Sequence, residues 1–164
     1  MPDDERVKIL FTESLRLLEA QQKDFDQIRV RASYLLTAIT ISTTFLGGSL
    51  IRVGKLSALD WAALVAFIIG LLLCAWLVAG PARDWYVGFD PVLAYENYYA
   101  KLDPPLTRDE FCIEMLYATE KGMDVNEGKL RIRRWALGIA ALALGFEILF
   151  WYLGINRFER IAQS

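Results

Sequence analysis

The chain has 164 residues, of which 55% are apolar and 23% are charged, and its formal net charge is −2. The apolar share exceeds the roughly 45–50% that is usual in soluble domains, which indicates a single membrane domain. The 18 basic and 20 acidic residues are interleaved, so we expect no nucleic-acid partner. The sequence has no histidine, no phosphate-binding glycine loop, no metal-binding spacing and no nucleophile–base pair, so we expect no metal, no cofactor and no enzyme.

The apolar residues are concentrated in three windows, 33–51, 61–80 and 135–156. Each window is close to the ~20 residues that an α-helix needs to cross a hydrocarbon core of ~30 Å. We therefore predict an all-α fold, an integral membrane helical bundle with three transmembrane helices. The segments outside the membrane would be a cytoplasmic two-helix stalk and an aromatic-rich linker.

Residues 3–32 are predicted to form the first helix of this stalk. Apolar side chains recur at helical spacing from Val7 to Ala32, and charged side chains take the opposite side. No glycine or proline lies between Pro2 and Gly47, so the amphipathic helix should continue without a break into the first span.

Residues 107–134 are predicted to form the second stalk helix. Thr107 followed by Glu110 is a capping-box signature at its start, and no proline separates it from the third span. Both stalk helices enter a span from the same side, so they should run parallel. The expected contact seam of the second helix follows three- and four-residue spacing through Phe111, Met115, Ala118, Gly122, Val125, Lys129 and Ile132.

The linker 81–106 is rich in aromatic residues. Asp90–Pro91 is typical of a helix start, so we expect a short helix up to about Lys101. Three places remain open for the aromatic side chains. They would lie in the headgroup layer, pack under the stalk or stack on a ligand.

Basic residues are distributed unequally between the two sides that three spans define. Fourteen of the 18 lie before the first span or in 81–134. The positive-inside rule therefore places the N-terminus and 81–134 in the cytoplasm and the C-terminus outside the cell membrane. The basic residues that suit contact with anionic lipid headgroups are Arg29, Arg31, Lys129, Arg131, Arg133 and Arg134.

Hydroxyl and glycine residues share one face of the first span. Such a face allows close helix packing and interhelical hydrogen bonds, or it lines a water-filled pore. Both interpretations stay open. The residues are Ser33, Thr37, Thr40, Thr44, Gly47 and Gly48.

The third span has two small-residue faces, about 180° apart by the helical period. One consists of Gly138, Ala141 and Gly145, and the other of Ala136, Ala140, Ala143, Glu147 and Gly154. Two opposite faces fit best if one packs within the protomer and the other between protomers. We therefore predict a homo-oligomer.

Glu147 is the single carboxylate near the middle of the third span. Its insertion costs about 2–3 kcal/mol, which the apolar residues around it offset, so the helix still inserts. Two roles are open for it. It is either protonated and hydrogen-bonded to Thr40 or Thr44, or part of a ring of carboxylates in a cation-conducting oligomer.

The segment Asp26–Ala38, in which a charged helix passes into a Ser/Thr-rich span, resembles the small membrane effectors of bacterial anti-phage systems. These are the SLATT-type proteins and the transmembrane effector of the cyclic-pyrimidine (Pycsar) systems, and the resemblance covers roughly residues 5–80. It implies an antiviral oligomer that breaches the inner membrane after a nucleotide signal or a partner protein activates it. The third span departs from the common two-span plan, and no nucleotide-binding residue carries over.

Two functions from different classes follow. The first is an oligomeric pore-forming or membrane-permeabilising effector, ion channel-like and gated through its cytoplasmic helices. The second is a non-conducting anchor or accessory subunit that recruits a cytoplasmic partner. A transporter subunit is disfavoured because the three spans show no inverted repeat.

Overall fold

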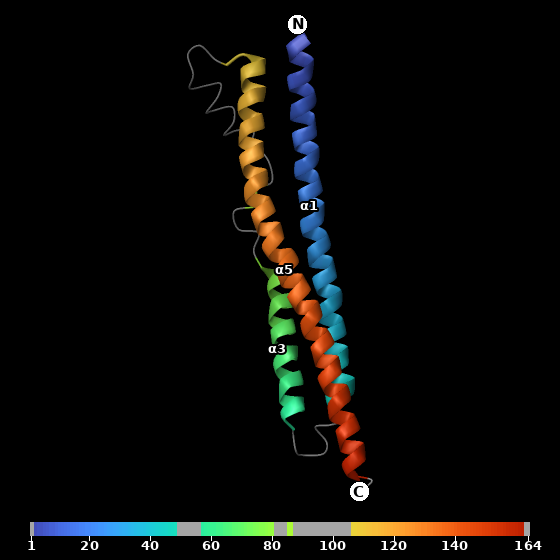
Figure 1. Cartoon of the computed structure of the whole chain (residues 1–164). Coiled ribbons are helices and arrows are strands. Elements are labelled where there is room, and N and C mark those ends of the chain that lie inside the picture. Colours follow the sequence, from blue (N-terminus) through green and yellow to red (C-terminus); the bar gives the residue numbers. More distant parts are fainter. Residues whose placement is uncertain (1, 49–56, 81–84, 87–105, 163–164) are drawn as a thin grey trace. The chain divides into compact units, whose positions relative to one another are not determined.

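The computed structural model describes residues 2–48, 57–80, 85–86 and 106–162, without the side chains of 2–5 and 157–162. All elements in this part of the chain are helices (Figure 1). They are α1 (Pro2–Ser42), the π-helical turn η1 (Thr43–Gly47), α3 (Ala58–Ala79) and α5 (Arg108–Ala162). The predicted all-α class is confirmed, and the short helix expected up to Lys101 lies outside the described residues.

The chain divides into two compact units. Unit 1 comprises Met1–Asp26 and Ala82–Arg131, and unit 2 comprises Gln27–Pro81 and Ile132–Ser164. The long helices α1 and α5 therefore contribute residues to both units, whereas α3 belongs to unit 2 alone.

Two of the described helices are long and apolar enough to cross a membrane. They are α3 and the part of α5 between Arg108 and Asn156, which contains the predicted third span. The apolar end of α1 is not among them: α1 ends at Ser42, before η1 begins, so only part of the predicted span 33–51 belongs to this helix, and 49–51 lie outside the described residues. The structure thus shows two candidate spans where the sequence predicted three.

The buried side chains of α1 follow a seven-residue repeat. Leu18, Phe25, Ala32 and Ile39 are almost fully buried, each seven residues after the last. Ile28, three residues after Phe25, is also buried and belongs to a second position of the same seven-residue repeat. A seam with an average spacing of 3.5 residues is typical of helices that pack along their length as in a coiled coil.

The seam of α5 in its first half differs from the predicted one. Val125 and Ile132 were expected to be in contact, but they are 47% and 61% exposed. Met115 and Gly122 are buried as predicted, but the prediction was wrong at Val125 and Ile132, because polar side chains that satisfy their hydrogen bonds occupy part of the real seam. The buried residues here are Met115, Thr119, Gly122, Asn126, Leu130 and Arg133.

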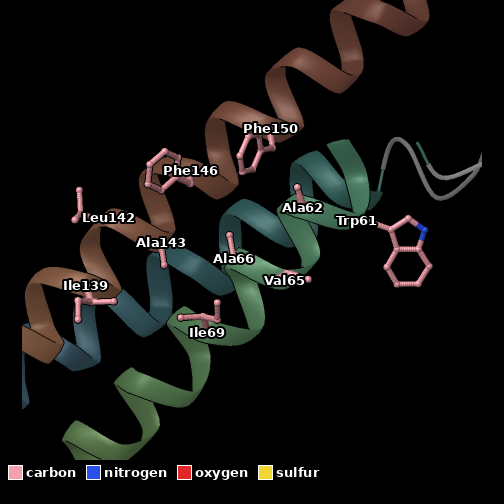
Figure 2. Close-up of a pocket in the computed structure, with 10 residues that line it drawn as sticks. All are labelled: Trp61, Ala62, Val65, Ala66, Ile69, Ile139, Leu142, Ala143, Phe146 and Phe150. Carbon is pink, nitrogen blue, oxygen red and sulfur yellow. The ribbon is translucent and has the colours of Figure 1, made fainter. Parts of the chain in front are cut away.

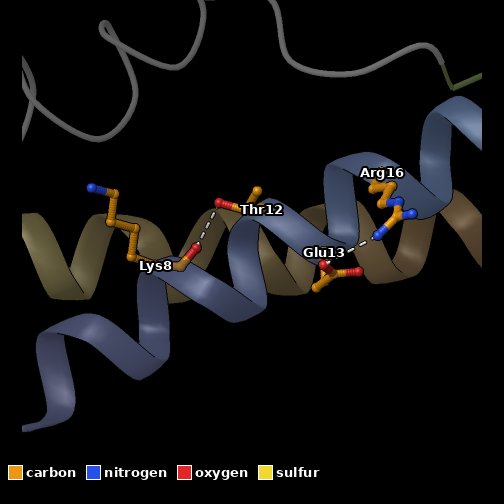
Figure 3. A network of polar contacts seen from close by, with 4 residues as sticks. All are labelled: Lys8, Thr12, Glu13 and Arg16. Atoms are coloured by element: carbon orange, nitrogen blue, oxygen red, sulfur yellow. Dashed lines mark hydrogen bonds and ion pairs between the residues drawn. The ribbon is translucent and has the colours of Figure 1, made fainter.

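In unit 1, the face of α1 away from its buried seam carries exposed charged and polar side chains (Figure 3). The Thr12 hydroxyl donates to the carbonyl of Lys8 at 2.8 Å, and Arg16 lies 3.8 Å from the Glu13 carboxylate. An exposed ion pair of this kind contributes at most about 1 kcal/mol. This face therefore interacts with solvent more than it stabilises the fold.

The predicted capping box at the start of α5 is confirmed. The Thr107 amide donates to Glu110 Oε2 at 2.8 Å, and the Glu110 amide lies 3.4 Å from the Thr107 hydroxyl oxygen. These bonds satisfy two of the amide groups that a helix start leaves without partners. A second capping box, between Ser57 and Asp60, starts α3 three residues before the predicted span.

The α5 start should fray at acid pH. Hydrogen bonds from the hydroxyl and the amide of Thr107 hold the pKa of Glu110 below its ordinary value. The box therefore stabilises the helix start above the ordinary glutamate pKa of ~4.3, and this stability is lost as the pH falls through the lower folded pKa. Amide hydrogen exchange at 108–111, corrected for intrinsic rates, should report it. Glu110→Gln should show no such pH dependence.

Candidate functional site

The core of unit 2 contains residues from α1, α3 and α5. Ile39, Cys74 and Ala140 are fully buried against one another, one from each helix. Gly70 of α3 permits this approach, because a methyl group there would lie 2.8 Å from the Ile39 Cδ1 atom. Small residues at such contacts let apolar helices pack closely.

Glu147 lies in this unit and is fully buried. The Thr43 hydroxyl of η1 donates a short hydrogen bond to its Oε1 atom. Its Oε2 atom and the indole nitrogen of Trp151 are also buried; neither makes a hydrogen bond of normal geometry, although the two side chains are close enough to interact. The carboxyl group is therefore held by one hydroxyl and faces one indole.

Gly47 and Trp151 form the next contact along the same two helices. Trp151 is fully buried, and a methyl group at Gly47 would lie 3.0 Å from its ring atom Cζ2. Thr43 with Glu147 and Gly47 with Trp151 are successive contacts that advance by one turn on both helices. The end of α1 and this part of α5 therefore run parallel in unit 2.

The π-helical turn coincides with this contact. η1 extends from Thr43 to Gly47, the two residues that meet Glu147 and Trp151. A π-helical turn holds an additional residue, so it changes which side chains face the seam. Such turns are frequent at functional sites. The site is defined here as Thr43, Gly47, Glu147 and Trp151.

The hydroxyl partner of Glu147 differs from the expected ones. The sequence indicated Thr40 or Thr44, but both are exposed and donate to backbone carbonyls four residues earlier. Ser33 and Thr37 do the same. Of the glycines predicted on this face, Gly47 is buried and Gly48 is exposed. The hydroxyl face of α1 therefore points away from the contacts inside unit 2.

The two small-residue faces of the third span have opposite environments. Ala136, Ala140, Ala143, Glu147 and Gly154 are buried within unit 2. Gly138, Ala141 and Gly145 are exposed, and nothing lies within 4 Å of a methyl group placed on either glycine. Among the described residues, the first face is packed within the chain and the second is not.

Two of the basic residues predicted at the headgroups cap α3 instead. Arg133 is 6% exposed and donates to the carbonyls of Leu77 and Gly80 at 3.3 and 3.4 Å. Arg29 donates to the carbonyl of Val78 at 3.2 Å. These carbonyls belong to the last turn of α3 and to its C-cap residue Gly80, where cations interact favourably with the helix dipole. Of the other four residues, Arg31, Arg131 and Arg134 are exposed and Lys129 is half-buried, and headgroup contact stays a prediction for them.

In unit 1, a buried asparagine holds the chain that follows α3. Both polar atoms of the Asn126 side chain bond the backbone of Tyr86, at 3.0 Å to its amide and 2.8 Å to its carbonyl. Trp85 packs on Phe25 with ring centroids 4.6 Å apart. For these two aromatic residues the structure shows packing on the helix pair, and the others of the linker lie outside the described residues.

The position of Tyr86 against α5, held by Asn126, gives a prediction for two glycines of this helix. A methyl group at Gly122 would overlap the Tyr86 ring, whereas a methyl group at Gly128 meets nothing within 4 Å. We expect Gly122→Ala to destabilise the protein by about 1–3 kcal/mol through overpacking, and Gly128→Ala to stabilise it by up to about 1 kcal/mol through helix propensity. Unfolding in mild detergent would measure both. Equal effects of the two variants would contradict the placement of the Tyr86 ring against Gly122.

Sequence reasoning missed Trp151, Thr43 and the capping role of Arg133. Trp151 follows Glu147 by four residues and so shares its face, a signal that was present in the sequence. Thr43 had no such signal, because the π-helical turn alters the face that it occupies. The last turn of α3 has no basic residue of its own, so its caps come from other helices.

The fold and the site together define an all-α protein with two helices that can cross a membrane and a buried carboxyl group between apolar helices. Comparisons with protein-family models, curated proteins and solved structures found no match. The resemblance to anti-phage membrane effectors therefore stays a prediction.

Proposed function

We propose that this protein is a three-span integral membrane protein that assembles into a membrane-permeabilising homo-oligomer. The window 33–51, predicted from the sequence as the first span, joins the two candidate spans in α3 and α5. Unit 1 lies in the cytoplasm with the N-terminus, and a cytoplasmic partner protein or a nucleotide signal acts on it to open the assembly. The C-terminus lies outside.

The exposed hydroxyl face of α1 carries the proposal. Ser33, Thr37, Thr40 and Thr44 are exposed in the apolar part of α1, opposite the packed seam through Ile39. Their hydroxyl protons are bonded to the helix backbone, but their oxygen lone pairs remain able to accept from water. A polar face of this kind gains more from a water-filled path or another subunit than from lipid.

The exposed small face of α5 supports assembly. Gly138, Ala141 and Gly145 leave room for a second helix to approach closely, as in small-residue helix contacts in membranes. Glu147 is then a structural group that joins α1 to α5 within each protomer. The path for ions is assigned to the hydroxyl face, and the ring of carboxylates is no longer needed.

Depolarisation of cells on expression tests this function. Thr40→Val together with Thr44→Val removes two hydroxyls at almost constant shape, and we expect it to reduce depolarisation strongly while the protein stays in the membrane. Thr12→Val is the matched control, because Thr12 makes the same bond four residues back outside the spans. Depolarisation that is unchanged by the double variant would contradict the hydroxyl-lined path.

The burial of Glu147 also favours a second candidate, the non-conducting anchor, because a carboxyl inside the protomer packing cannot line a path. In that case unit 1 would recruit a soluble partner through exposed apolar residues such as Leu17 and Tyr117, which are 57% and 65% exposed. Stable co-purification of one soluble protein without depolarisation would support the anchor over the pore.

A further inference from the structure

An open apolar groove of about 660 Å³ runs between α3 and α5 in unit 2 (Figure 2). Its floor is made of small residues, Ala62, Ala66 and Ala143. Larger side chains, such as Ile69 and Phe146, form its walls. The hollow exists because alanines meet where the two helices approach and longer side chains flank them.

The length of the groove matches one leaflet of a bilayer. It extends from Trp61 to Ile69 on α3 and from Ile139 to Phe150 on α5, which is about 12 and 16 Å at 1.5 Å per residue. Half of a hydrocarbon core of ~30 Å is ~15 Å. The groove is therefore about as long as the acyl chain of one leaflet.

One end of the groove has the features of a membrane interface. Trp61, which is 60% exposed, lies next to the capping box of Ser57 and Asp60 at the start of α3. Tryptophan is enriched where hydrocarbon meets headgroups. The remaining lining is hydrocarbon, so an occupant needs a polar group only at this end.

We propose that this groove holds one acyl chain of a membrane lipid, from the leaflet at the N-terminal end of α3. The inference rests on the membrane location in the proposed function. A second copy of the chain is the less suitable occupant, because membrane helices of different copies pack best through surfaces of small residues without large projecting side chains. Here Phe146 and Leu142 project beside the hollow, while the small face with Gly138 and Gly145 lies elsewhere on α5.

Photo-crosslinking to lipid tests the proposal. The protein would be placed in vesicles of phosphatidylethanolamine and phosphatidylglycerol that contain a phosphatidylethanolamine with a diazirine on its acyl chain. Labelled positions are then mapped by peptide mass spectrometry. We expect labelling at Ile69 and Phe146 to exceed that at Leu72, an exposed residue of α3 outside the groove, by about tenfold, equivalent to about 1.4 kcal/mol.

A filling variant completes the test. Ala66→Phe should reduce the groove labelling to the level at Leu72, and Ala75→Phe, on an exposed position of the same helix, should leave it unchanged. Uniform labelling of all exposed positions in the wild-type protein would overturn the proposal. This result does not depend on whether the Ala66→Phe variant folds. Disulfide formation between copies of an Ile69→Cys variant, without lipid labelling, would assign the groove to a second copy.

The outcome is separable from that of the proposed function. A labelled groove in vesicles that stay impermeable even at high protein density would contradict the pore and support the lipid site. Permeable vesicles with an unlabelled groove would overturn the lipid site alone.

Discussion

Replacing Glu147 with alanine is expected to lower the free energy of unfolding in detergent by about 2–3 kcal/mol. The variant removes the hydrogen bond from Thr43 and leaves a cavity beside the buried Trp151. Cavities of this kind cost 2 kcal/mol or more in well-packed proteins, and an interhelical hydrogen bond in a membrane protein adds about 0.6 kcal/mol, at most ~1.7. Equilibrium unfolding of the wild type and the variant in the same detergent would measure the loss.

Two further variants separate the hydrogen bond from the cavity. Glu147→Gln keeps an oxygen that accepts from Thr43, so we expect a smaller loss and unchanged permeability. Combining Thr43→Val with Glu147→Ala gives a double-mutant cycle, and its coupling energy reports the bond itself. If Glu147→Gln abolished permeability and left assembly and stability intact, Glu147 would belong to the ion path and its assignment as a structural group would be wrong.

Gly138→Leu and Gly145→Leu are each expected to dissociate the oligomer and to leave the protomer folded. A side chain on either glycine extends into open space within one chain. In an assembly that uses this face it would separate two closely packed helices, whose association depends on small residues. Native mass spectrometry in detergent would show the oligomer in the wild type and monomers in the variants.

Ala75→Leu serves as the matched control, because Ala75 is exposed on α3 and also lies within a candidate span. It should leave the oligomer intact. Oligomers that persist in both glycine variants would place the contact between copies on another face, such as the hydroxyl face of α1.

The helices were predictable because their signals are local. Continuous apolar runs and the Thr107–Glu110 spacing fix where α3 and α5 begin, and the absence of Gly and Pro between Pro2 and Gly47 allows one long α1. The number of membrane spans was harder to predict than the positions of the helices. Hydroxyl residues in 33–48 are compatible both with a span and with a helix packed on others, so hydropathy alone does not decide between them.

The contacts of the site were less predictable because they depend on how helices meet. Helical periodicity placed Ala136, Ala140 and Ala143 on the face of Glu147, and these residues are buried together. It did not identify Thr43, since the π-helical turn changes the register of α1 at this point. The capping role of Arg133 likewise depends on where the last carbonyls of α3 lie in space.

The most direct test of the proposed function is the permeability of vesicles that contain the purified protein. We predict that phosphatidylethanolamine and phosphatidylglycerol vesicles release potassium when they contain the wild-type protein at high density. Gly145→Leu should prevent this release at the same amount of inserted protein. Vesicles that retain potassium although they contain inserted wild-type oligomers would contradict the account and favour the non-conducting anchor.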